Sequence, residues 1–226
     1  MMGARRLLWV IVSVLSTLVL FGLSFAAFAL GRGDWVAFLQ SPARAGALVV
    51  SLALSALVVF SDFGGMNPGK KEDRSNRWIY GPIFVLLLGM AVLPPYLDGR
   101  NLWAADEAVT PYVGLALLTL GGTLRLAAVF ALGRRFTGLV AIQEEHRLQT
   151  GGLYRHIRHP SYAGILLYMA GYGLVFRCWL CLVLVAGTLA LLLARMNAEE
   201  ALLESEFGEE YASYRHRTWR LVPWVY

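Results

Sequence analysis

Residues 152–164 read GLYRHIRHPSYAG. Two arginines and two histidines in this stretch come directly before an apolar run that continues to Phe176. Pro160 suits the first turn of a helix, where its missing N–H costs nothing. The stretch therefore predicts polar chemistry held at the surface of a membrane, at the start of an apolar helical hairpin.

The composition is that of an integral membrane protein. Of 226 residues, 58% are hydrophobic and 15% charged, and the mean hydropathy is +0.57, whereas an average soluble domain has about a quarter of its residues charged. Leu7–Leu30 contains no charged residue. A helix of that length reaches about 36 Å, which exceeds a hydrocarbon core of about 30 Å.

The distribution of positive charge predicts the topology, because short cytoplasmic loops collect Lys and Arg. With six crossings and the N-terminus inside, 15 of the 20 Lys and Arg residues fall on the cytoplasmic side and four on the other side. We therefore expect an all-α polytopic protein with both termini in the cytoplasm and a C-terminal cytoplasmic helical tail. The predicted spans are Leu7–Leu30, Ala45–Phe60, Trp78–Leu97, Pro111–Leu132, Ser161–Phe176 and Cys178–Ala194.

The chain is expected to form one membrane domain whose two parts differ in character. Residues 1–110 read as supporting spans, and residues 111–226 carry nearly every unusual polar residue. After Arg195 the chain is expected to leave the membrane as a tail with one apolar helical face. Gly208 is the expected break in that tail.

Several function classes are disfavoured. The net charge of +5 is spread over loops beside the membrane, which topology explains better than nucleic acid binding. Cys178 and Cys181 have C-x-x-C spacing, but no further Cys or nearby His completes a metal site, so we expect helix packing and no metal. Zinc-protease, P-loop, serine-hydrolase and Rossmann patterns do not occur.

The candidate reactive groups each have a plainer alternative. The basic cluster could only anchor the protein to lipid, but anchoring has no use for a proline, a tyrosine and a glycine at fixed offsets. Glu199 and Glu200 could be a solvated pair, or could bind ribose hydroxyls, balance a cation or act as a base. Arg125 lies inside a span, where charges generally face the protein interior, unless its side chain extends back to the surface. The tyrosines could form an interfacial belt or hold a cation.

The second half of the chain closely resembles the isoprenylcysteine carboxyl methyltransferase family and the related phospholipid methyltransferases. The resemblance covers about residues 120–224. It rests on Arg125, Leu132-Gly133, Phe136, His146, Gly152, Tyr154, Arg158-His159-Pro160, Tyr162, Gly164, Glu199-Glu200, Phe207 to Tyr211, Tyr214 and Pro223.

This resemblance implies an S-adenosylmethionine-dependent methyltransferase of the bacterial cytoplasmic membrane. A lipophilic or small acceptor would enter sideways between helices. Catalytic roles are then expected of Arg125 and Glu199. Contacts to the cofactor are expected of His146, Tyr154, Arg158, His159, Tyr162 and Glu200.

Two other functions compete with this one. A sterol or steroid reductase would bind NADPH at the same end, but such enzymes commonly have an acidic residue soon after the glycine that Gly164 matches, and here Ile165 follows. A non-enzymatic membrane scaffold is the other. The acceptor stays open among a prenylated cysteine, a small thiol, an aminophospholipid and another isoprenoid.

Overall fold

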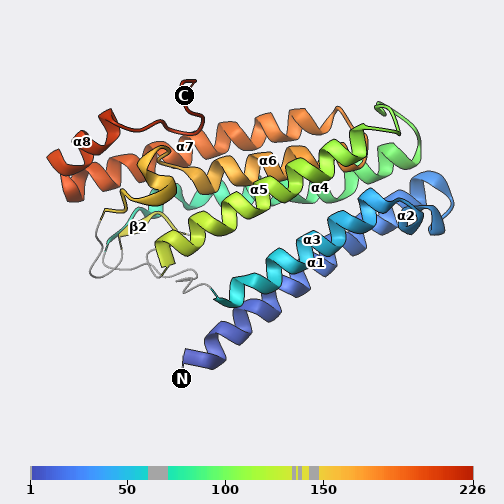
Figure 1. The fold of residues 1–226 in the computed structure, drawn as a ribbon, viewed down its shortest axis with the longest axis horizontal. Helices are drawn as coiled ribbons and strands as arrows, with labels where there is room; N and C mark the ends of the chain where they lie inside the picture. Colours follow the sequence, from blue (N-terminus) through green and yellow to red (C-terminus); the bar gives the residue numbers. More distant parts are fainter. Residues whose placement is uncertain (1, 61–70, 134–135, 137–138, 143–147, 226) are drawn as a thin grey trace.

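The computed structural model describes residues 2–60, 71–133, 136, 139–142 and 148–225. This part of the chain is almost entirely helical (Figure 1). The helices are α1 (Met2–Arg32), α2 (Val36–Gln40), α3 (Pro42–Leu57), α4 (Tyr80–Gly99), α5 (Thr110–Leu132), α6 (Pro160–Val175), α7 (Cys181–Phe207) and α8 (Glu209–His216). Short 3-10 turns occupy Val58–Phe60, Arg74–Ile79 and Gly152–Arg155.

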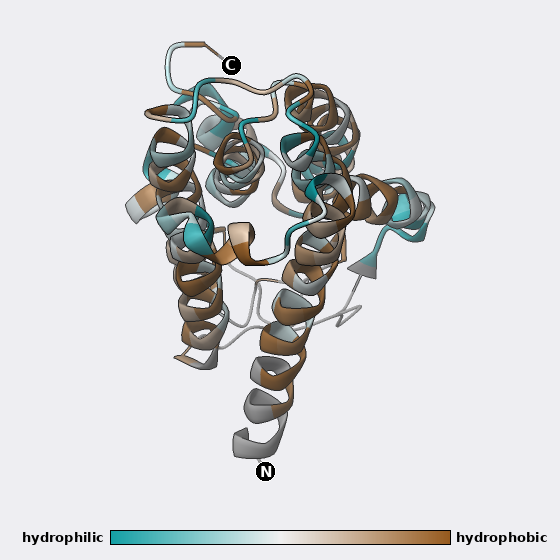
Figure 2. Ribbon diagram, turned by 90° about the vertical axis from the view of Figure 1, so that its right-hand side faces the viewer, coloured by the Kyte–Doolittle hydropathy of each residue, from teal (hydrophilic) through white to brown (hydrophobic). Residues whose placement is uncertain are grey.

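A helix lies at each of the six predicted spans. Four stretches are long and apolar enough to cross a membrane: Ile11–Arg32, Arg74–Gly99, Thr110–Leu132 and Cys181–Phe207. The helices α3 and α6 have 16 residues each and are shorter. Viewed along the bundle, the helices are largely hydrophobic, with scattered hydrophilic stretches (Figure 2). The polytopic all-α fold is thus confirmed, while six crossings remain a prediction.

The last long helix runs beyond the predicted end of its membrane span. The span Cys178–Ala194 and the first part of the predicted helical tail form one helix, because α7 continues through Glu199 and Glu200 to Phe207. The segment after Arg195 is rich in Ala, Glu and Leu, which favour helix and give no signal to stop. The break comes at Gly208, as predicted, where φ is +49°. Glycine adopts this conformation without steric cost, and α8 begins directly after it.

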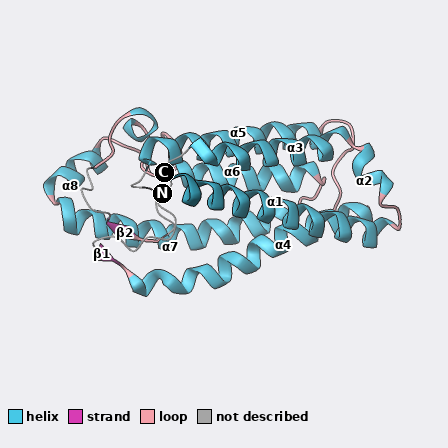
Figure 3. Ribbon diagram, turned by 90° about the horizontal axis from the view of Figure 1, so that it is seen from below, coloured by secondary structure: helices cyan, strands magenta, loops and turns pink. Residues whose placement is uncertain are grey.

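The two ends of the bundle are closed by different elements. At one end lie α8 and a two-stranded antiparallel ladder, in which β1 (Lys71–Glu72) pairs with β2 (Ala141–Ile142). At the other end lies α2 (Figures 1 and 3). The ladder joins the α3–α4 connection to the α5–α6 connection, so both connections cover the same end of the helices.

Glycines bring α5 and α6 into backbone contact. A Cβ atom at Gly164 would lie 2.7 Å from both the backbone N of Arg125 and the carbonyl O of Gly121. About two turns further along α6, a Cβ at Gly171 would lie 2.3 Å from the backbone N of Leu118. Small residues allow such close approach in membrane helices. The close packing fixes the position of Arg125 relative to the start of α6.

A cluster of three buried charged residues stabilises the end of the bundle that lies far from α8. Asp98, at the end of α4, is 1% exposed. It bonds to Arg44 of α3 and, at 2.6 Å, to Arg177 in the α6–α7 turn. Because a buried charge is costly unless it is paired, each of the three elements is fixed by the other two.

Candidate active site

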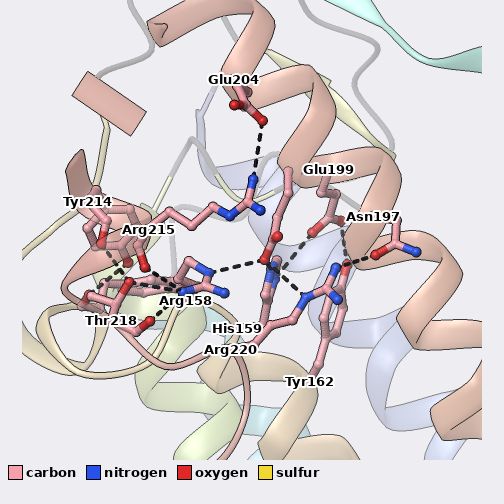
Figure 4. Close-up of polar contacts among 12 residues, drawn as sticks. Arg158, His159, Tyr162, Asn197, Glu199, Glu204, Tyr214, Arg215, Thr218 and Arg220 are labelled. Atoms are coloured by element: carbon pink, nitrogen blue, oxygen red, sulfur yellow. Dashed lines mark hydrogen bonds and ion pairs between the residues drawn. The ribbon is translucent and has the colours of Figure 1, made fainter. Parts of the chain in front are cut away.

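The segments that carry the predicted polar residues meet at the α8 end of the bundle. Arg158 and His159 come directly before α6, Tyr162 lies in its first turn, and Glu199 comes from the last third of α7 (Figure 4). Glu200 follows Glu199 on the same helix. The chain after α8 returns beside them. The imidazole of His159 stands at the α6 N-terminus, where anions are favoured, and the anions there are the two carboxylates.

Glu200 is held by three cationic or imidazole groups. Its Oε1 lies 2.9 Å from Nε2 of His159 and 3.1 Å from Nε of both Arg158 and Arg220. The residue is 8% exposed. A buried carboxylate needs such partners because its desolvation is otherwise unfavourable. Glu200 therefore fixes His159 and Arg158 in place.

Glu199 belongs to a second, adjoining network. Its Oε1 accepts hydrogen bonds from the hydroxyl of Tyr162 and, at 3.2 Å, from Nε of Arg195. The same Nε lies 2.6 Å from the Tyr162 hydroxyl, and Nη1 of Arg195 donates to the hydroxyl of Tyr80 at 3.0 Å. The rings of His159 and Tyr162 are stacked, with centroids 5.5 Å apart. The network thus joins α4, α6 and α7.

Residues 218–220, called the strap here, close the site from the tail side. The backbone N of Arg158 donates to the carbonyl of Trp219 at 2.8 Å, and that of His159 donates to the carbonyl of Arg220 at 3.1 Å. The Arg158 guanidinium also donates to the carbonyl of Thr218. The strap therefore delivers Arg220 to Glu200.

A cavity of about 400 Å³ adjoins these networks. One face of α7 forms a continuous wall, and its first and last wall residues span about 22 Å along the helix axis. The other walls come from α4, α5, α6, α8 and the α5–α6 connection. The α7 wall consists of Thr188, Leu192, Arg195, Glu199, Leu202 and Leu203.

The cavity changes from polar to apolar along its length. Arg125, Arg158, His159 and Glu199 line its polar part. Toward the middle of the bundle the side chains on the wall are apolar, apart from one threonine, and come from α4, α6 and α7. They are Ile83, Leu87, Ile165, Met169, Thr188 and Leu192.

Arg125 faces this cavity and differs from the other arginines on the wall. Its Nη1 donates to the hydroxyl of Ser161 at 3.0 Å. Within the described part of the chain, no carboxylate lies within ion-pair distance of it. By contrast, Arg158 pairs with Glu200 and Arg195 pairs with Glu199. The cavity therefore presents one guanidinium that can receive an anion from a bound molecule.

The structure places the predicted site residues in different positions relative to the cavity. Six of them line it: Arg125, Tyr154, Arg158, His159, Tyr162 and Glu199. Glu200 lies behind the wall, bonded to two of its residues. His146 lies outside the described residues.

Sequence reasoning missed two residues of the Glu199 network. The charge pattern places Arg195 on the cytoplasmic side and indicates no further role, although Arg195 precedes Glu199 by four residues, the spacing at which helical side chains meet. Tyr80 comes from the half of the chain expected only to support the site. No pattern around Tyr80 indicated a functional role.

A membrane-embedded helical bundle with an ionic site at one end and an apolar cavity beside it defines an integral membrane enzyme. The comparisons with known proteins give its class. The model of the isoprenylcysteine carboxyl methyltransferase family matches residues 114–205. The probable protein-S-isoprenylcysteine O-methyltransferase of Oryza sativa subsp. indica is 36% identical over 165 residues, which cover 70% of this chain and 84% of the rice protein.

Two further comparisons give similar results. The human protein-S-isoprenylcysteine O-methyltransferase is 34% identical over 115 residues, which cover 50% of this chain and 40% of the human protein. The solved structure of a eukaryotic intramembrane Ras methyltransferase of the same family shares the fold, with a TM-score of 0.51 and 20% identity. That likeness covers 91% of this chain and 74% of the other.

The chain belongs to the isoprenylcysteine carboxyl methyltransferase family. It is an integral membrane methyltransferase, as the sequence predicted. The alternative of an NADPH-dependent reductase is not supported, because the family model and the curated relatives are methyltransferases.

Proposed function

We propose that the enzyme transfers a methyl group from S-adenosylmethionine to the carboxylate of a lipophilic acceptor of the isoprenylcysteine type. The observation that carries this proposal is Arg125, which faces the cavity with no carboxylate partner among the described residues. A guanidinium in that setting favours an anion and can hold a carboxylate through two parallel hydrogen bonds. An amine acceptor would instead meet a like charge.

The apolar part of the cavity supports the proposal of a lipophilic acceptor. Its walls are the side chains of α4, α6 and α7 toward the middle of the bundle. An aliphatic chain there would be removed from water, which stabilises binding in proportion to the apolar area covered. The acceptor would thus lie with its chain among these helices and its carboxylate at Arg125. A small thiol would leave this part of the cavity empty.

The polar part fits the cofactor. Glu199 supplies a carboxylate on the wall, and the stacked rings of His159 and Tyr162 stand beside it. A sulfonium or ammonium is attracted both by a carboxylate and by an aromatic face. In our proposal Tyr154, Arg158, His159 and Tyr162 contact the cofactor, and Glu200 positions Arg158 and His159. His146 stays a proposed contact on the resemblance alone.

When bound, S-adenosylmethionine supplies an electrophilic methyl group whose C–S bond breaks as a C–O bond to the acceptor forms. A carboxylate oxygen provides the electron pair and releases no proton, so the chain needs no general base for this step. Arg125 would orient the acceptor, and the apolar walls would exclude water. Since opposite charges are neutralised during the transfer, a dry site favours it.

We also propose that the site faces the cytoplasmic side of a bacterial membrane, with both termini inside. The support is the excess of Lys and Arg on that side. Within one membrane domain, residues 1–110 are proposed mainly to support the fold, and residues 111–226 to carry most of the site. Tyr80, Ile83 and Leu87 of α4 line the same cavity as the second half of the chain.

The test uses purified protein in detergent and methyl-labelled S-adenosylmethionine. An S-farnesylated cysteine with a free carboxylate should become labelled in an ester that mild base hydrolyses. The matched control is the same molecule with its carboxyl group as an amide, which should stay unlabelled. Labelling of a phosphatidylethanolamine or of an alkyl thiol, with none of the carboxylate, would contradict the proposal.

A further inference from the structure

The residues that follow the strap form a turn whose apolar side chains are uncovered. In this turn, Val222–Val225, the backbone N of Val225 donates to the carbonyl of Val222 at 3.2 Å. Trp224 is 84% exposed and Val225 is 77% exposed. The φ of Trp224 is +64°, a conformation that is uncommon for a bulky side chain. The turn therefore presents apolar side chains outward, and the described part of the chain does not cover them.

Packing against α7 places this turn at the level where the apolar part of that helix ends. Leu221 directly precedes the turn and is buried with Leu192 and Met196 of α7. From Cys181 to Ala194 α7 has no charged residue, and Arg195 is the first one. The chain after α8 thus returns along α7 (Figure 1) to the expected boundary between lipid and water.

The residues between α8 and the turn have the composition of a membrane interface. Trp219 of the strap is exposed, as is Arg217 directly before the strap. Nε of Arg217 donates to the carbonyl of Ser213 at 3.1 Å, and among the described residues no carboxylate lies within ion-pair distance of it. Tryptophan is enriched where lipid meets water, and basic residues at that level attract anionic headgroups. A lipid surface therefore suits both kinds of side chain.

The strap connects this turn to the candidate site. The backbone amides of Arg158 and His159 donate to the strap, and the amide of Trp219 donates back to the carbonyl of His156 at 2.9 Å. Only Leu221 separates the strap from the turn. Any interaction that holds the turn in lipid will therefore also hold the strap against the start of α6.

We propose that Val222–Val225 insert into the lipid–water interface beside α7 and that Arg217 binds an anionic lipid headgroup. The membrane then holds the strap on the site. This surface and its lipid partner depend neither on the acceptor nor on the cofactor of the proposed function. In a bilayer without anionic lipid the headgroup contact is lost, so the strap should open more often.

Spin labels test where the turn lies. Val225→Cys and, as a control, Glu210→Cys on the exposed face of α8 are labelled in nanodiscs of equal amounts of phosphatidylcholine and phosphatidylglycerol. Cys178 and Cys181 are buried and should not react, which the wild type checks. The label at position 225 should be more accessible to oxygen than to a water-soluble nickel chelate, and the label at position 210 should show the reverse. Equal, water-like accessibility of both labels would overturn the inference.

Hydrogen exchange of the segment around Arg158 and His159 tests the connection to the site. In the same nanodiscs, Trp224→Ser should speed this exchange about tenfold, because it removes apolar area that holds the turn in lipid. Trp103→Ser is the matched control. Trp103 is also exposed, at 69%, and has a φ of +54°, but it lies in the α4–α5 connection. The control should leave the exchange unchanged. Equal rates for the wild type and Trp224→Ser would overturn the connection.

Lipid composition tests the headgroup contact. Exchange of the same segment should be about fivefold slower with phosphatidylglycerol than in phosphatidylcholine alone, as expected for one basic residue beside an anionic surface. Arg217→Gln should abolish this difference. Melting temperatures in detergent should be the same for the wild type and Arg217→Gln, since the side chain is exposed. Equal exchange of the wild type in the two lipids would show that Arg217 binds no headgroup.

Discussion

Glu199 and Glu200 are consecutive on α7, yet they meet opposite nitrogens of one imidazole. Oε1 of Glu200 is 2.9 Å from Nε2 of His159, and Oε2 of Glu199 is 3.7 Å from Nδ1. Glu200 lies behind the cavity wall and also pairs with Arg158 and Arg220, whereas Glu199 lies on the wall itself. We infer that the two carboxylates have separate roles, with Glu200 positioning its neighbours and Glu199 facing the ligands.

Replacement of each glutamate by glutamine separates these roles. Glu200→Gln removes the carboxylate that the half-buried Arg158 and Arg220 share, so the free energy of unfolding should fall by about 3 kcal/mol. Glu199→Gln should cost less, about 1 kcal/mol, because the Glu199 side chain is more exposed than that of Glu200 and because Arg195 stays bonded to Tyr80 and Tyr162. Thermal denaturation in detergent shows which of the two variants is less stable. Equal destabilisation by the two changes would contradict the separation.

The same pair should differ in ligand binding. Glu199→Gln removes a negative charge from the wall, so affinity for the cationic S-adenosylmethionine should fall more than affinity for the neutral sulfur of S-adenosylhomocysteine. The difference should be about tenfold, because a close charge pair contributes on this scale. Calorimetry with both compounds measures it, and a uniform loss for the two ligands would argue against a role near the sulfonium.

Arg125→Lys keeps the positive charge and removes the planar fork. If Arg125 holds the acceptor carboxylate, kcat/KM for a farnesylated cysteine should fall about 100-fold, a loss near 3 kcal/mol of transition-state stabilisation. Affinity for S-adenosylhomocysteine should change little. Steady-state kinetics and calorimetry on one preparation check both statements.

A companion change tests whether the position of Arg125 matters. Ser161→Ala removes the hydroxyl that accepts from its Nη1 at 3.0 Å but leaves the guanidinium in place. The loss in kcat/KM should be about tenfold or less. If Ser161→Ala were as damaging as Arg125→Lys, the arginine would owe its importance to helix packing and not to the acceptor.

Much of the fold could be predicted because its signals are local. Uncharged runs predicted the long helices, Pro160 predicted the start of α6, and Gly208 predicted the end of α7. The length of α7 could not be derived from hydropathy, since its last turns leave the apolar region without losing helical propensity. A charge pattern marks a change of environment and does not mark the end of a helix.

The candidate site was predictable where it consisted of clustered residues in one stretch. Arg158, His159 and Tyr162 stood together in the sequence, and the structure brings them to Glu199 and Glu200. Tyr80 and Arg220 reach the site only through tertiary packing, one from α4 and one from the strap. Single polar residues far away in the chain give no periodicity by which to recognise them.

Gly164→Ala should disrupt the contact between α5 and α6. Its Cβ would lie 2.7 Å from the backbone N of Arg125 and the carbonyl of Gly121, and neither backbone atom can rotate away. The helices must separate, so we expect a loss of about 3 kcal/mol in stability and reduced activity as Arg125 moves from Ser161. Gly22→Ala is the matched control, because nothing lies within 4 Å of its Cβ position. Similar melting temperatures for the two variants would exclude this packing argument.

Tyr80→Phe tests whether the first half of the chain takes part in the reaction. The residue lies outside the span matched by the family model, and its hydroxyl accepts from Nη1 of Arg195 at 3.0 Å. The Arg195 guanidinium also lies 5.5 Å from the centre of the Tyr80 ring, a contact that Phe retains. The variant should therefore stay folded while Arg195 holds Glu199 and Tyr162 less firmly, and kcat should fall about three- to tenfold. Rapid-quench measurement of a single turnover assigns the loss to the transfer step. An unchanged rate would show that Tyr80 contributes only to packing. The residues of α4 would then shape the cavity without taking part in the reaction.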